Sequence, residues 1–168
     1  EYTNSFLSFF PTIEVILNIE ADHLDFFKDL DDIRNSFREF AKLLPEDGTL
    51  IINSDIENYQ EICEGLSCKV VAVGSDPEKS HYSAANVTFG ATACATYDLY
   101  VDGVKTDTVT LGVPGMHNVY NSLAAIAAAD EVGISLEDIK KGLLSYSGTH
   151  RRFEKKGDLN GVTIIDDY

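Results

Sequence analysis

Three polar side chains, His117, Asn118 and Asn121, follow a Gly-Val-Pro-Gly segment and open an Ala-rich run. The glycines and the proline end a strand pattern, and the Ala, Leu and Ile residues that follow favour a helix. Unpaired N–H groups and a partial positive charge at a helix start suit a phosphate, and two amides three residues apart share a face that suits an adenine edge. Alternatively, Asn118 only caps the helix and Asn121 lies at the surface, and spacing leaves both interpretations open.

A second polar group follows the apolar run 13–19, which is typical of a buried parallel strand. His23 lies there within the acidic segment 20–25, at the strand end where open α/β sheets build ligand sites. Imidazole and carboxylates, with Glu1 from an earlier segment, form an oxygen-rich, sulfur-free set that suits Mg²⁺ or Mn²⁺. A loop of solvated acids around a structural histidine is the simpler alternative, because spacing does not prove convergence.

Two doublets near the end of the chain could also bind a nucleotide. Arg151 and Arg152 have planar guanidinium groups that suit a phosphoryl group, although such pairs more often lie at the surface. Asp166 and Asp167 follow an apolar strand and could accept ribose hydroxyls, or be solvated turn residues. The sequence contains neither a Gly-x₄-Gly-Lys-[Ser/Thr] loop nor a Gly-x-Ser-x-Gly elbow, so it predicts no Walker-type phosphate cradle and no serine nucleophile.

Composition narrows the classes of partner. The chain has 168 residues, 44% of them hydrophobic, which is enough for one substantial core. A net charge of −15 argues against nucleic acid and against anionic membrane surfaces, and a phosphorylated ligand would need a metal ion to offset the acidic field. Three cysteines without paired spacing indicate reduced thiols and a cytoplasmic protein, and neither a membrane span nor a signal peptide is present in the sequence.

The elements that must position these side chains alternate between strands and helices. Strands are expected at 13–19, 49–53 and 69–74, with helices at 30–44 and from a capping box at residue 54 to about 65. This rhythm predicts an α/β fold with a mostly parallel sheet flanked by helices.

Residues 82–111 predict a small antiparallel β-sheet beside the parallel one. Its clearest hairpin pairs 95–101 with 104–111 around an Asp102-Gly103 turn. The remaining expected elements are a helix ending near residue 130, a helix from a capping box at residue 135 to about 146, a turn at 157–161 and a buried strand at 162–165.

Four motifs in this order resemble those of the Mur ligases: NIEADHLD at 18–25, PGMHNVYNSLAA at 114–125, GTHRRFE at 148–154 and IDDY at 165–168. The resemblance is closest to the alanine-adding branch. It implies an ATP-dependent amide ligase of peptidoglycan synthesis that joins L-alanine to UDP-N-acetylmuramate through an acyl phosphate. It also implies that residues 1–148 are a partial central ATP-binding domain without its P-loop, with 82–111 as the antiparallel part. Residues 149–168 are then the hinge and first strand of a C-terminal domain.

The same resemblance implies roles for individual residues, with ATP and Mg²⁺ as cofactors. Glu1 and His23 correspond to the family's metal ligands, and together with Arg152 they are expected to be the catalytic residues. The implied nucleotide contacts are His117, Asn118, Asn121 at the adenine, Arg152 at the phosphates and Asp167 at the ribose.

Departures from the family pattern limit what this stretch is expected to do alone. The phosphate-binding Gly-Lys-Thr loop and the UDP-binding domain would precede Glu1, and most of the amino-acid-binding domain would follow Tyr168, so the piece alone is expected to be inactive. Phe37 and Arg38 stand where several relatives have a carbamoylated lysine, which fits the alanine-adding branch. A muropeptide-recycling ligase and a non-catalytic nucleotide-binding module of the same fold remain the alternatives.

Overall fold

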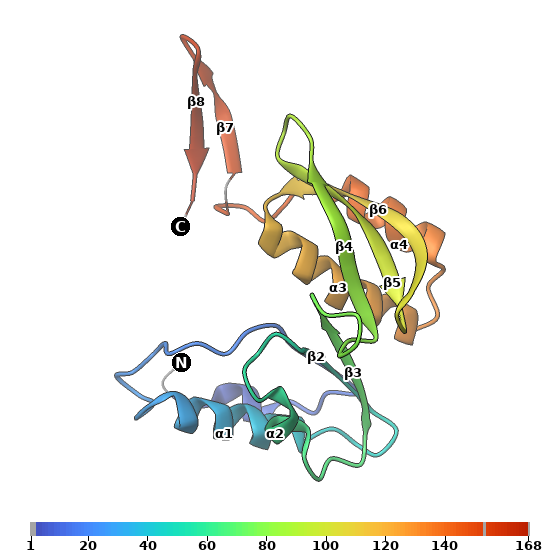
Figure 1. The fold of residues 1–168 in the computed structure, drawn as a ribbon. Coiled ribbons are helices and arrows are strands. Elements are labelled where there is room, and N and C mark those ends of the chain that lie inside the picture. Colours follow the sequence, from blue (N-terminus) through green and yellow to red (C-terminus); the bar gives the residue numbers. More distant parts are fainter. Residues whose placement is uncertain (1–2, 153, 168) are drawn as a thin grey trace.

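The computed structural model describes residues 3–152 and 154–167 (Figure 1). Six strands form one sheet in chain order: β1 (Ile13–Ile16), β2 (Thr49–Asn53), β3 (Lys69–Gly74), β4 (Tyr82–Phe89), β5 (Cys94–Val101) and β6 (Val104–Pro114). The helices are η1 (Ser5–Ser8, 3₁₀), α1 (Leu30–Ala41), α2 (Tyr59–Cys63), α3 (Met116–Glu131) and α4 (Leu136–Ser145). A separate two-stranded sheet contains β7 (Glu154–Leu159) and β8 (Val162–Asp166).

The sheet combines parallel and antiparallel pairing, which confirms the predicted fold class. Strands β1 to β4 pair in parallel, whereas β4, β5 and β6 pair antiparallel. The antiparallel strands are continuous with the parallel ones, because β4 pairs with β3 on one edge and β5 on the other. At the predicted hairpin turn, Asp102 and Gly103 both have positive φ (49° and 74°), as a two-residue type I′ turn requires.

Strand β2 is buried on both of its faces. Leu50, Ile51 and Ile52 are each 0% exposed, and side chains alternate between the two faces of a strand. Leu50 and Ile52 join the core under α1 and α2, whereas Ile51 joins the core under α3. Helix α3 packs across all six strands, so its N-terminus is held rigidly over one edge of the sheet.

Two of the predicted helices begin with a side-chain N-cap, and the capping box predicted at residue 135 is confirmed. The Asp29 carboxylate accepts the N–H of Asp32 at 3.0 Å at the start of α1, and Ser135 Oγ accepts the N–H of Asp138 at 3.3 Å at the start of α4. The capping box predicted at Ser54 is wrong. Its hydroxyl instead hydrogen-bonds Ser80 Oγ at 2.7 Å, and α2 begins only at Tyr59. A tertiary partner has therefore replaced the local one.

The C-terminal hairpin differs from its prediction in two respects. The turn is at Asn160 and Gly161, which both have positive φ, and Gly157 lies within β7. The strand predicted as buried at 162–165 is exposed, because β7 and β8 extend away from the six-stranded sheet (Figure 1). The range 149–168 thus contributes two strands rather than one.

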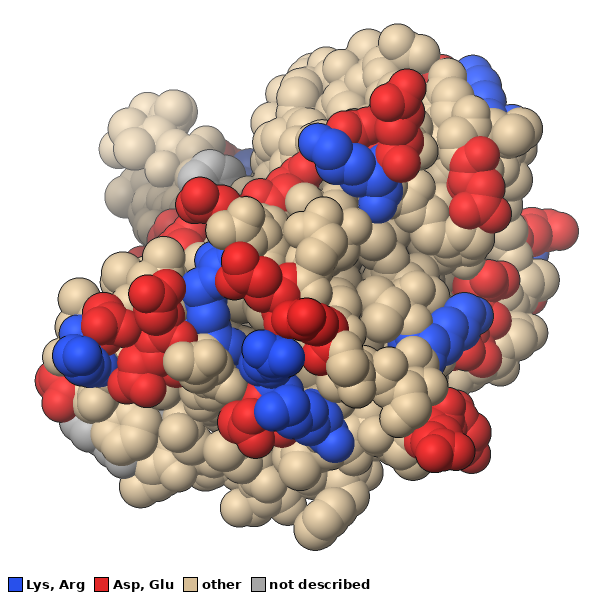
Figure 2. All heavy atoms as spheres, turned by 60° about the horizontal axis from the view of Figure 1, so that its bottom comes forward, with Lys and Arg blue, Asp and Glu red and all other residues tan. Residues whose placement is uncertain are grey.

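Figure 2 shows acidic and basic side chains interspersed over the face that α1 and α2 cover. Arg38 lies 3.7 Å from a Glu64 carboxylate oxygen, and Lys42 lies 2.6 Å from Glu39 on the same helix. Arg38 and Lys42 are therefore each paired with an acid. None of the helices among the described residues combines the length and apolar character needed to span a bilayer.

Candidate functional site

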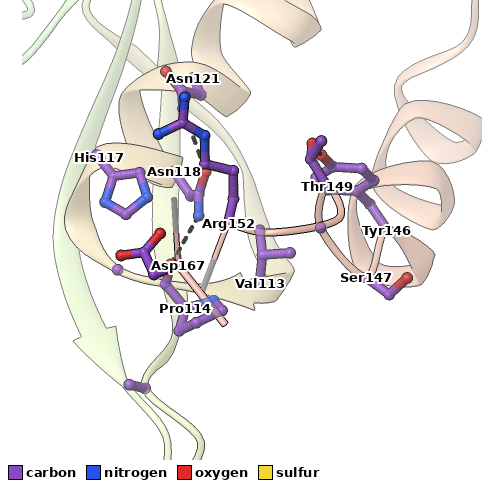
Figure 3. A pocket seen from close by; sticks show the side chains of 13 residues that line it. Val113, Pro114, His117, Asn118, Asn121, Tyr146, Ser147, Thr149, Arg152 and Asp167 are labelled. Carbon is purple, nitrogen blue, oxygen red and sulfur yellow. Dashed lines mark hydrogen bonds between the residues drawn. The ribbon is translucent and has the colours of Figure 1, made fainter. Parts of the chain in front are cut away.

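A cavity of about 670 Å³ lies where β6 leads into α3 (Figure 3). It brings together segments that are far apart in the sequence: the end of β6 and the start of α3, the chain that follows α4, and the residue after β8. The predicted nucleotide-binding residues that line it are His117, Asn118, Asn121, Arg152 and Asp167. One cavity thus collects every predicted nucleotide contact.

Gly115 shapes the entrance to α3. Its φ of 99° is unfavourable for other residues, and an added Cβ would lie 2.7 Å from Cε1 of His117. The Gly115 N–H donates to the Ala93 carbonyl oxygen at 3.1 Å, which ties the start of α3 to the turn before β5. The glycine therefore lets the imidazole of His117 fold back over the backbone at the cavity wall.

The two asparagines form a short chain of hydrogen bonds. Asn118 Nδ2 donates to the Pro114 carbonyl oxygen at 2.8 Å, and Asn121 Nδ2 donates to Asn118 Oδ1 at 3.3 Å. The N-cap of α3 is Gly115 and no side chain caps it, so the interpretation of Asn118 as only a cap is wrong. Since a primary amide has two N–H groups and a carbonyl oxygen, Asn121 retains hydrogen-bonding capacity for a ligand.

Only one member of each predicted doublet lines the cavity. The guanidinium of Arg152 reaches toward the start of α3 in Figure 3, whereas the backbone N–H of Arg151 donates to the Glu154 carboxylate at 2.8 Å. Asp167 lines the cavity, whereas Asp166 lies 3.5 Å from the Lys156 ammonium. The Lys156 hydrogen bond, followed by the Arg151 N–H, lowers the pKa of Glu154 to about 2. Glu154 thus remains ionised and anchors the start of β7.

His23 lies in a second hollow, of about 460 Å³, at the end of β1. Its backbone has φ of 51°, and its carbonyl oxygen accepts the N–H groups of Phe26 and Phe27. Its side chain is 53% exposed, with Nε2 3.9 Å from Asp22 Oδ2. The other lining residues are Phe6, Asn18, Glu20, Phe27, Ile33, Phe37 and Phe40. The two hollows share no lining residue, so His23 is not part of the cavity at α3.

Of the two predicted metal ligands, the structure describes His23 but not Glu1. Glu1 lies outside the described residues, and among those described no three His, Cys, Asp or Glu side chains converge closely enough to hold an ion. Mg²⁺ is commonly held by one or two carboxylates and completes its shell with water and phosphate oxygens. Among the described residues, Asp22 beside His23 supplies one such carboxylate near the end of β1.

Phe37 and Arg38 of α1 have different neighbours. Phe37 faces the hollow of His23, whereas Arg38 turns toward α2 and donates to the Glu64 carbonyl oxygen at 3.3 Å. The wall opposite the histidine is therefore aromatic, with Phe6 stacked on Phe37 at a ring distance of 5.8 Å.

Comparison with known proteins identifies the family of this chain. Residues 3–129 match the family model of the Mur ligase middle domain. The chain belongs to this family. It is 60% identical to the UDP-N-acetylmuramate–L-alanine ligase of Lachnospira eligens over all 168 residues, which cover 37% of that protein. It is 52% identical to the enzyme of the same name from Lachnoclostridium phytofermentans, of which it covers 38%.

Solved structures of Mur ligases share the fold. MurF from Acinetobacter baumannii superposes with a TM-score of 0.83 at 29% identity, over 97% of this chain and 35% of that one. The UDP-N-acetylmuramate–alanine ligase MurC from Thermotoga maritima gives 0.81 at 26% identity, over 98% and 36%. The Mur ligase resemblance drawn from four motifs is thus confirmed, and the chain spans little more than a third of the relatives' length.

The motif-based predictions did not include Tyr146, Thr149 or Val113 as site residues, yet all three line the cavity. No charge or metal-ligand pattern distinguishes them in the sequence. Val113 lies at the end of β6, next to the start of α3, whereas Tyr146 and Thr149 reach the site because α4 packs against β6, and that contact is tertiary.

Proposed function

We propose that this chain is the middle portion of a cytoplasmic ATP-dependent ligase that joins L-alanine to UDP-N-acetylmuramate in peptidoglycan synthesis. The observation that carries the proposal is the single cavity lined by His117, Asn118, Asn121, Arg152 and Asp167. Amides, a guanidinium and a carboxylate in one space suit the base, phosphates and ribose of a nucleotide. The names of the relatives supply the substrates.

In this proposal each part of the cavity holds one part of ATP. Asn121 contacts the adenine, and the hydrogen bond from Asn121 to Asn118 orients the Asn121 side chain. Arg152 contacts the phosphates, and Asp167 accepts a hydrogen bond from a ribose hydroxyl. His23 and Glu1 would hold Mg²⁺, which when bound neutralises phosphate charge. His23 would then act at the far end of the triphosphate, since it lines a different hollow from Asn121.

The chemistry proposed here needs no protein nucleophile. ATP phosphorylates the muramoyl carboxylate, the amine of L-alanine attacks the acyl phosphate, and phosphate leaves. Positioning and charge neutralisation then supply most of the rate enhancement, as in other phosphoryl transfers. We further propose that residues 1–148 belong to the central domain and residues 149–168 to the hinge and start of the next domain, so that the segment alone is inactive.

Neighbouring arginines provide the test. In the full-length protein, Arg152→Ala is expected to lower kcat/KM for ATP by about 100-fold, because a charge-assisted contact to phosphate is lost. Arg151→Ala is the matched control, since Arg151 does not line the cavity. Phosphate release with UDP-N-acetylmuramate and L-alanine is the measurement. Equal losses in both variants, or none in Arg152→Ala, would contradict the proposed role.

The same assay separates the alternatives. Replacing L-alanine by the free tripeptide L-alanyl-γ-D-glutamyl-meso-diaminopimelate, which has an unacylated amine, tests a recycling ligase, an activity that the names of two murein peptide ligase neighbours make relevant. ATP binding without phosphate release under either condition would instead indicate a nucleotide-binding module. Alanine-dependent phosphate release by residues 1–168 alone would overturn the expectation that the segment is inactive.

A further inference from the structure

The cavity at the start of α3 has two unlike sides. His117, Asn118 and Asp167 lie on one side, and Val113 and Tyr146 lie on the other (Figure 3). The first side offers charge and hydrogen bonds, whereas the second offers an aliphatic group and an aromatic ring. A ligand that matches both sides has hydrogen-bonding groups toward the first side and a flat, weakly polar face toward the second.

Tyr146 is 48% exposed, and both its backbone N–H and its hydroxyl are hydrogen-bonded. Its backbone N–H donates to the Gly142 carbonyl oxygen at 3.0 Å, which closes the last turn of α4. Its hydroxyl shares a 2.8 Å hydrogen bond with Thr149 Oγ1. Tyr146 lines the cavity, and its hydroxyl already has a partner within its own segment.

Gly112 allows the end of α4 to reach this place. An added Cβ at Gly112 would lie 2.3 Å from the Leu144 carbonyl oxygen and 2.4 Å from that of Tyr146. Both are backbone atoms, so a side chain at position 112 can be accommodated only by moving the end of α4 away from β6. Gly112 itself does not line the cavity.

We propose that Tyr146 is the aromatic wall on which the nucleotide base lies, and that Gly112 is a positioning residue for it. The inference rests on the proposed function, namely that this cavity binds a nucleotide. A base has a flat π-face, and stacking on one aromatic ring changes affinity by roughly 10-fold or more. In this arrangement the base keeps its polar edge toward Asn121, and the proposed contact of Arg152 to the phosphates is independent of the ring.

The experiment compares ATP with inorganic tripolyphosphate, which has the charge but no base, by calorimetry on the full-length protein with Mg²⁺. Tyr146→Leu and Gly112→Ala are each expected to weaken ATP binding by about 10-fold and to leave tripolyphosphate binding unchanged. Tyr146→Phe keeps the ring and is expected to stay within about twofold of the wild type. Gly142→Ala is the matched glycine control, because nothing lies within 4 Å of its Cβ position.

The outcomes separate the two proposals. Wild-type protein that binds no ATP would refute the proposed function and this inference with it. ATP binding that Tyr146→Leu leaves unchanged, or a parallel loss of ATP and tripolyphosphate binding, would refute the stacking role alone.

Discussion

Glu14 is a carboxylate buried in the sheet without a hydrogen-bond partner. It is 3% exposed, and neither of its carboxylate oxygens has a partner among the described residues. It lies on β1 on the same face as Ile16, in the core that α1 covers. Burial disfavours the charged form and raises the pKa of Glu14 from its usual value near 4.5 to about 7.

The raised pKa makes stability depend on pH in a defined direction. Below pH 4.5 the carboxyl is protonated in both the folded and unfolded states, and its contribution is constant. Between pH 4.5 and 7 the folded state binds more protons than the unfolded state, so the free energy of unfolding falls as pH rises. A difference of roughly 2.5 units corresponds to a loss of about 3 kcal/mol once the pH is well above 7.

Glu14→Gln tests this because the amide has nearly the same shape and cannot ionise. Urea unfolding of the full-length protein gives the difference in free energy of unfolding between variant and wild type, once at pH 4.5 and once at pH 8.5. The variant is expected to gain about 3 kcal/mol relative to the wild type between the two pH values. Any constant cost of a buried amide cancels in this comparison. Glu46→Gln, which alters an exposed carboxylate in the turn before β2, is the control. Parallel pH–stability curves for Glu14→Gln and wild type would refute the reasoning.

Three further substitutions test the architecture around the site. Tyr97→Phe removes a buried 2.6 Å hydrogen bond to Ser122 and should lower the free energy of unfolding by about 1 kcal/mol, measured by urea titration; an unchanged midpoint would contradict it. Gly115→Ala should lower the free energy of unfolding by about 1–3 kcal/mol and weaken ATP binding, because position 115 has a φ of 99° and the added Cβ would press on His117. A normal ATP affinity by calorimetry would contradict this prediction and show that the start of α3 adapts. Asp29→Ala should cost about 1 kcal/mol through loss of the α1 N-cap, with a smaller cost for Asp29→Asn, and equal effects of the two would argue against capping.

Local patterns in the sequence were enough to locate most elements. The bounds of β2 and β3 match the predicted ranges 49–53 and 69–74, and the Asp102-Gly103 turn has the predicted backbone. These successes share a cause: β-branched runs, turn dipeptides and helix caps act through near neighbours in the chain. Ser54 shows the limit, because its hydroxyl found a partner at Ser80 that no local pattern indicates.

The sequence predicted the polar residues of the site, whereas tertiary packing added the remaining residues that line the cavity. Asn118, Asn121, Arg152 and Asp167 were marked by motif order, and the structure brings them to one cavity. The choice of Arg152 over Arg151 for the cavity depends on how the chain turns before β7. Tyr146 carries no sequence signal, because an exposed aromatic residue after a helix is ordinary until β6 is packed beside it.

What the amino-acid sequence determined by itself was the order and kind of the elements, the helix that opens with His117 and the identity of the polar groups, since backbone propensity and side-chain chemistry are local. Only the tertiary structure decided that Glu14 is buried with no hydrogen-bond partner among the described residues, that β8 is exposed, and that His23 occupies a different hollow from Asn121. Burial and convergence depend on which faces of distant segments meet. That is settled when α1 and α3 cover opposite faces of the sheet, because each face then excludes water from whatever side chains it carries.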